Sequence, residues 1–72
     1  MGRVLVIGEA ARVRPFALAG AVVAAADSAE AAVRAWTARP GDVTLVILTP
    51  RAAEALSGLP RPAEILEAVM EG

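Results

Sequence analysis

Four consecutive large apolar residues near the start of the chain constrain its fold more than any other feature. Val4, Leu5, Val6 and Ile7 follow one another with no polar residue between them, and Gly8 ends the run. A strand with one face in water alternates apolar and polar residues. An unbroken run is typical of a strand buried on both faces, as at the centre of a parallel sheet. We therefore expect residues 4–7 to form a central strand.

Two further segments complete the expected sheet. Residues 43–48, Val-Thr-Leu-Val-Ile-Leu, predict a second strand buried on both faces. Residues 21–26 are shorter and rich in alanine, with two β-branched residues. They predict a weak strand at an edge, bounded by Gly20 before it and a helix-capping signal at Asp27 after it.

Helix signals follow each strand. Residues 10–19 have helical spacing closed by Gly20, and Pro15 favours a late start to this helix because proline is tolerated in a first turn. Asp27 and Glu30 have the form of a capping box for a helix that extends to about residue 38. Trp36 is expected to pack from this helix onto the sheet. Thr49 and Pro50 predict the N-cap and first position of a short third helix.

The last segment favours a fourth helix. Pro62 can begin it, and Ile65, Leu66, Val69 and Met70 would form an apolar stripe along one face. Because the preceding Leu-Pro-Arg-Pro stretch leads directly into this pattern, we expect a fourth strand to be absent or degenerate.

The order of these elements predicts a single α/β domain over residues 1–72. Alternating strands and helices give a parallel sheet with right-handed crossovers and helices on both faces. We expect a small flavodoxin- or Rossmann-like sheet of three strands in the order 2-1-3. Residues 43–48 would then form an edge strand that is too apolar to remain free. The C-terminal helix, another copy of the chain or a partner would cover it.

The composition excludes several function classes. The chain has no cysteine, histidine, lysine or tyrosine, and its seven arginines nearly balance eight acidic residues. A zinc site and most forms of nucleophilic or acid–base catalysis are therefore not expected, and the even charge argues against nucleic-acid binding. The longest apolar run, within residues 16–26, is too short to span a bilayer. With a strand pattern starting at the first residues, no signal peptide is expected, so we predict a cytoplasmic protein.

The carboxyl ends of the strands offer no standard cofactor site. A dinucleotide site needs a glycine-rich turn, but Glu9 follows Gly8 where a pyrophosphate would bind. A phospho-receiver needs an aspartate where Thr49 stands. Glu9 and Asp27 could bind a divalent cation weakly, although a capping residue and a surface acid explain them better. We expect no cofactor and no bound metal.

Several short motifs resemble the F subunit of the V-type and A-type rotary ATPases. The stretch Phe-Ala-Leu-Ala-Gly at residues 16–20 is similar to a motif of that family. Ile-Gly-Glu at residues 7–9 matches the end of its first strand, and Val-Ile-Leu-Thr at residues 46–49 matches its third. Pro15 departs from the family's glycine. The family also continues into a fourth strand and a C-terminal helix; here the Leu-Pro-Arg-Pro stretch leads directly to a helix-like segment, and the fourth strand is missing or degenerate.

The resemblance implies a non-catalytic central-stalk subunit. Such a protein would bind a coiled-coil shaft subunit of the D type, couple ATP hydrolysis or synthesis to proton or sodium transport, and sit at the membrane periphery without inserting. The motif and the apolar edge suggest an interface made of Phe16, Leu18, Gly20, Val43, Leu45, Ile65 and Val69. Two alternatives remain: a small ligand-sensing domain of flavodoxin-like shape, and a homodimeric module that pairs through the strand edge at residues 43–48.

Overall fold

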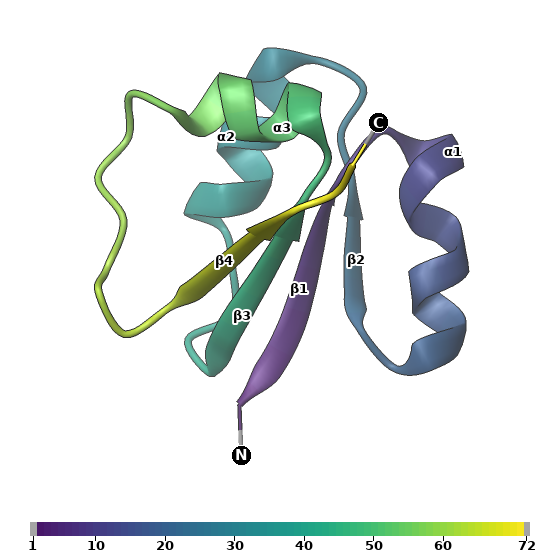
Figure 1. Cartoon of the computed structure of the whole chain (residues 1–72), viewed down its shortest axis with the longest axis horizontal. Coiled ribbons are helices and arrows are strands. Elements are labelled where there is room, and N and C mark those ends of the chain that lie inside the picture. The colour runs from purple at the N-terminus through teal and green to yellow at the C-terminus, as the bar shows by residue number, and fades with distance from the viewer. Residues whose placement is uncertain (1, 72) are drawn as a thin grey trace.

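A four-stranded parallel sheet forms the centre of the molecule, as the computed structural model shows for residues 2–71 (Figure 1). The strands lie in the order β2-β1-β3-β4, so the apolar run in β1 occupies an interior position. The predicted α/β class and the 2-1-3 order are confirmed, and a fourth strand extends the sheet. Along the chain the elements are β1 (Arg3–Gly8), α1 (Ala10–Val13), the 3-10 helix η1 (Arg14–Ala19), β2 (Val22–Ala25), α2 (Ala29–Thr37), β3 (Val43–Leu48), α3 (Pro50–Leu56) and β4 (Leu66–Val69).

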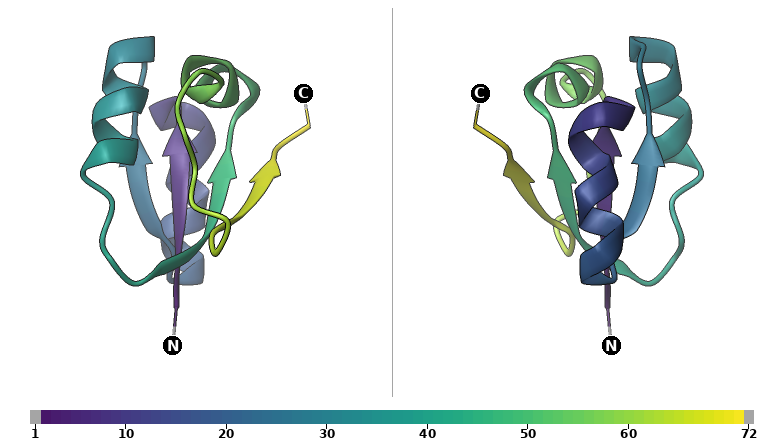
Figure 2. Two further views of the ribbon diagram at one scale, coloured as in Figure 1. Left: turned by 90° about the vertical axis from the view of Figure 1, so that its left-hand side faces the viewer. Right: turned by 90° about the vertical axis from the view of Figure 1, so that its right-hand side faces the viewer.

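Helices lie on both faces of the sheet (Figure 2). Leu5 and Ile7 of β1 belong to the main core, which they share with Trp36 of α2 and Leu56 of α3. Because successive side chains of a strand point to opposite faces, Val6 lies on the other side, the side of α1 and η1. Val6 is completely buried. The unbroken apolar run of β1 thus serves two cores.

The first helix begins earlier than its proline suggested. It is helical from Ala10 and changes to a 3-10 helix at Arg14, so Pro15 falls in the first turn of η1. The expectation of a late start was wrong, because this change of helix type removes the need for a hydrogen bond from residue 15. Gly20 ends η1 with φ of 87°, a left-handed conformation that favours glycine.

The second helix is capped by a different residue from the predicted one. Ser28, not Asp27, is the N-cap, and its Oγ accepts a hydrogen bond from the Ala31 N–H at 3.1 Å. The third helix is as predicted: Thr49 is its N-cap and Pro50 its first residue. None of the helices within residues 2–71 combines the length and apolar character that crossing a membrane requires.

The C-terminal segment is a strand and not the predicted helix. β4 pairs in parallel with β3, placing Leu66 beside Leu45 and Val69 beside Leu48. Residues 43–48 are therefore an interior strand, and pairing of two copies through that edge is ruled out in this structure. Arg61 holds the connecting loop, since its Nη1 donates to the Leu56 carbonyl at 3.0 Å and its Nε lies 2.8 Å from Glu67 Oε2.

Candidate functional site

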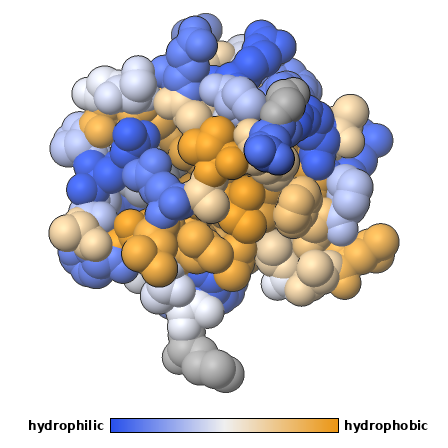
Figure 3. Space-filling view, viewed as in Figure 1, coloured by the Kyte–Doolittle hydropathy of each residue, from blue (hydrophilic) through white to orange (hydrophobic). Residues whose placement is uncertain are grey.

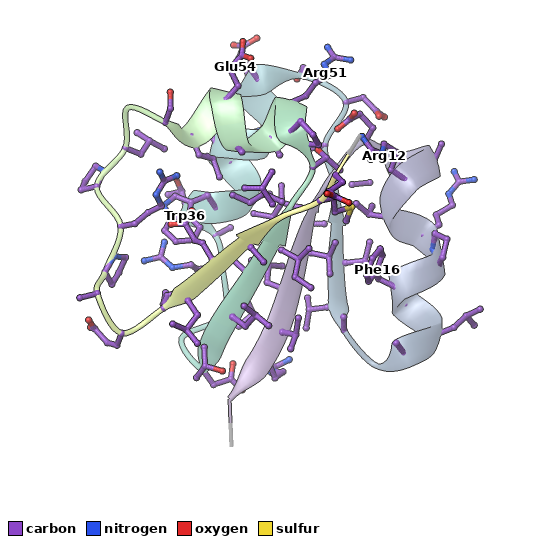
Figure 4. All side chains as sticks on the ribbon, viewed as in Figure 1. Arg12, Phe16, Trp36, Arg51 and Glu54 are labelled. Carbon is purple, nitrogen blue, oxygen red and sulfur yellow. The ribbon has the colours of Figure 1, made fainter. Side chains whose placement is uncertain are left out.

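A cleft of about 370 Å³ lies at the carboxyl ends of the strands, where ligands bind in folds of this kind. Its polar lining comes from the ends of β1 and β2 and from α3: Glu9, Asp27, Ser28, Arg51 and Glu54. Arg51 and Glu54 project outward from α3 above the sheet (Figure 4). The remaining lining residues are alanines, so any chemistry in the cleft depends on these five side chains.

Glu9 is held by a hydrogen bond from Thr49. The Oγ1 of Thr49, whose side chain is completely buried, donates to Glu9 Oε1 at 2.5 Å and accepts from the Ala52 N–H at 3.3 Å. The hydroxyl hydrogen bond holds the pKa of Glu9 below its ordinary value, with a further contribution from its own backbone N–H and from the charges of Arg51 and Arg12. Glu9 is thus an ionised link between β1 and β3.

Asp27 makes a second link across the same end of the sheet. Its Oδ1 accepts a hydrogen bond from the Ala10 N–H at 3.1 Å and so joins the end of β2 to the start of α1. Within residues 2–71 no three acidic, histidine or cysteine side chains gather in a way that could hold a metal ion. The arrangement ties strand ends together.

The state of Glu9 predicts a pH dependence of stability. Because folding lowers the pKa of Glu9, its contribution is fully present above the unfolded value near 4.5 and is lost as the pH falls through the lower folded value. We expect the Tm to decrease as the pH is lowered below about 4.5. Glu9→Gln should lower the Tm at neutral pH and make the decline in acid shallower.

The matched control for this measurement is Asp42→Asn. The hydrogen bond from Arg3 also lowers the pKa of Asp42, but this pair lies at the opposite end of β1 and about half of each side chain is exposed. Asp42→Asn should therefore lower the neutral-pH Tm less than Glu9→Gln does. An unchanged acid profile in Glu9→Gln would contradict the role assigned to the Thr49 hydrogen bond.

The second surface of interest is an apolar face of the sheet. Val46 and Leu48 of β3 belong to the core under α2 and α3, so Leu45 and Ile47 face the side of α1. The register of β4 adds Leu66 and Ala68 to this face. We call these four residues, Leu45, Ile47, Leu66 and Ala68, the open face.

No helix of the described chain, residues 2–71, covers the open face. The α1–η1 segment packs over β1 and β2, and apolar surface remains visible over the sheet between this segment and β4 (Figure 3). Leu66 is 69% exposed. Parallel sheets normally have both faces covered by helices, so the open face is a surface where another element would pack.

Neither protein-family models nor curated proteins give a match to this chain. The functional interpretation therefore depends on the sequence motifs and on the geometry of the two surfaces.

The residues predicted as an interface are divided between several surroundings. Leu18 of η1 is 95% exposed, and Leu45 is half-buried on the open face. Phe16 is half-buried and points from η1 toward the sheet (Figure 4), and Gly20 is exposed at the end of η1. Phe16, Leu18 and Gly20 thus belong to η1 or its end, and Leu45 lies on the same face of the sheet as η1.

The other predicted interface residues lie elsewhere. Val43 is 5% exposed and belongs to the core, so it is not available to a partner. Ile65 packs against the same core, and Val69, 53% exposed, faces the side of α2 and α3. The sequence interpretation missed Leu66 as a member of the open face, because the segment that holds it was read as a helix. Reading it as a strand parallel to β3 would have placed Leu66 beside Leu45.

Proposed function

We propose that this chain is the non-catalytic F subunit of a V-type or A-type rotary ATPase. In that role it binds a coiled-coil shaft subunit of the D type and couples ATP hydrolysis or synthesis to proton or sodium transport. It works in the cytoplasm, at the membrane periphery, through the ATPase complex. The observation that carries the proposal is the open face, which lies beside the Phe-Ala-Leu-Ala-Gly motif in η1 and Gly20.

The fourth strand also supports the proposal. The family that the motifs resemble continues into a fourth strand, and β4 fills that place in the sheet. A coiled-coil helix carries an apolar stripe, which is the kind of surface that packs on the open face. The cleft does not favour the ligand-sensing alternative, since Glu9 and Asp27 already hold the strand ends.

The proposal predicts a stable complex with a D-type shaft subunit. Co-expressed with that protein, the chain should elute with it in size-exclusion chromatography. Leu66→Asp should weaken the complex by about tenfold or more, because a charge would replace an exposed leucine of the open face. Val69→Asp is the matched control: it places the same charge on an exposed residue of β4 that faces the other side of the sheet, and should leave the complex intact.

Two results would reject this function. The first is failure of the wild-type chain to bind any D-type shaft subunit. The second is a gene that does not lie among those of a rotary ATPase. Thermal-shift titration with nucleotides and phosphate tests the ligand-sensing alternative, and a rise in Tm at millimolar ligand would favour it.

A further inference from the structure

The outer side of the α1–η1 segment is itself apolar. Val13 is completely buried against the sheet, whereas Ala11, Pro15 and Leu18 are exposed at positions i, i+4 and i+7. Leu18, at 95% exposed, is the most exposed of the large apolar residues within residues 2–71. One molecule therefore presents an uncovered apolar helix stripe next to a sheet face that lacks a helix.

The two surfaces also match along the strand direction. The α1–η1 segment descends from the carboxyl ends of the strands toward their amino ends (Figure 1). The register puts Val22, three residues after the end of η1, level with Leu5 of β1, Val46 of β3 and Glu67 of β4. The end of η1, which holds Leu18, therefore lies toward the level at which β4 begins with Leu66, and the start of η1 at Arg14 lies nearer the carboxyl ends of the strands. Two copies can face each other about a two-fold axis that runs parallel to the strands. Such an axis leaves each residue at the same level along the strands and sets the β4 edge of one copy opposite the α1–η1 segment of the other. This arrangement brings Leu18 of one copy to Leu66 of the other.

The charged residues leave the open face itself apolar. Residues 10–19 contain Arg12 and Arg14 and no acid, whereas residues 64–71 contain Glu64, Glu67 and Glu71 and no base. Glu67 pairs with Arg61, and Arg12 donates to the backbone carbonyl of Glu71. By the register of β4, Glu67 lies beside Val46 and faces the side of α2 and α3, so no charged residue of β4 interrupts the open face.

We propose that two copies of this chain associate face to face, with the α1–η1 segment of each lying over β3 and β4 of the other. Each segment supplies the helix that the partner's open face lacks, and the contact is isologous because each copy uses the same surface. Leu18 is the central apolar anchor and Arg14 contributes from the rim. This inference does not depend on the proposed function, but the dimer would occupy the open face and therefore compete with a shaft subunit.

Sedimentation equilibrium of the full chain, from micromolar to millimolar concentration, tests the inference. We expect a reversible dimer, weakened about tenfold or more by Leu18→Asp. Arg14→Glu, at the rim of the contact, should weaken it less. Val69→Asp, on the other face of β4, should have no effect. Because all of these positions are exposed, far-UV circular dichroism should show unchanged folding.

Two results would overturn the inference: a monomer at every concentration, or a dimer that Leu18→Asp leaves unchanged, including one that Val69→Asp breaks. This last case would show pairing through the free edge of β4. The inference and the proposed function fail separately. A monomeric chain that binds a shaft subunit removes only the dimer, and a dimer that ignores every shaft subunit removes only the stalk role.

Discussion

Replacing Trp36 with alanine should lower the free energy of unfolding by about 3–5 kcal/mol, one of the two largest effects we expect from a single substitution. Trp36 is 4% exposed and packs from α2 into the core that it shares with Leu5, Ile7 and Leu56. Truncation removes the largest apolar side chain of that core and leaves a cavity. Domains are stable by about 0.05–0.15 kcal/mol per residue, so a chain of 72 residues should lose a large part of its stability.

Urea denaturation followed by far-UV circular dichroism measures this loss, since the variant has no tryptophan fluorescence. Trp36→Phe is the matched control and should lose less, because it keeps an aromatic ring in the core. Arg39→Ala removes the cation stacked 4.0 Å from the ring centre, a contact worth about 0.5–1 kcal/mol at a partly exposed site, together with the hydrogen bond from Arg39 Nη1 to the Trp36 carbonyl. A loss below about 1 kcal/mol for Trp36→Ala would contradict its place in the core.

The interior of the sheet could be predicted from sequence because burial on both faces leaves a clear pattern. β1 and β3 are unbroken or nearly unbroken runs of large apolar residues, and each ends at a residue that marks a boundary, Gly8 for β1 and Thr49 for β3. The start of α3 was equally clear, because a threonine followed by a proline is typical of an N-cap and the first residue of a helix. Local signals sufficed wherever one conformation alone suited the residues.

The C-terminal strand could not be predicted because its residues suit a helix at least as well. Leucine, glutamate and alanine are good helix formers, and the apolar residues from Ile65 to Met70 also fit helical spacing. The deciding factor is the otherwise free edge of β3, which gains backbone hydrogen bonds along Leu66–Val69. Such long-range pairing overrides a weak local preference and leaves no mark in the segment itself.

The candidate site was only partly predictable for the same reason. Glu9 and Thr49 were recognised as strand-end residues, but the hydrogen bond between them joins positions forty apart in the chain, and nothing local indicates it. Asp27 was recognised as a polar signal at the end of β2, yet its acceptor role is toward Ala10 and not toward its own helix. The open face required the register of β4, so it emerged only with the fourth strand.

Gly8→Ala should be strongly destabilising, because Gly8 lies directly against the side chain of Thr49. A Cβ on residue 8 would lie 2.9 Å from the Cβ of Thr49 and still closer to its methyl group. Thr49 is completely buried and its hydroxyl is bound to Glu9 and to the Ala52 N–H, so it cannot rotate away without losing both hydrogen bonds. Overpacking costs about 1–3 kcal/mol, and loss of the α3 N-cap adds about 1 kcal/mol.

Thr49→Ser in the same chain should recover part of the loss, because serine keeps the hydroxyl and removes the methyl group that meets the new Cβ. The two substitutions should therefore be non-additive in urea denaturation, since each changes the same contact. Gly41→Ala is the control, because a Cβ at that exposed position would have no neighbour within 4 Å. If Gly8→Ala were as stable as Gly41→Ala, or if the double variant were simply additive, the close contact between Gly8 and Thr49 would be contradicted.

If the contact is correct, Gly8→Ala should also make the acid decline of the Tm shallower, because displacement of Thr49 removes the main cause of the low pKa of Glu9.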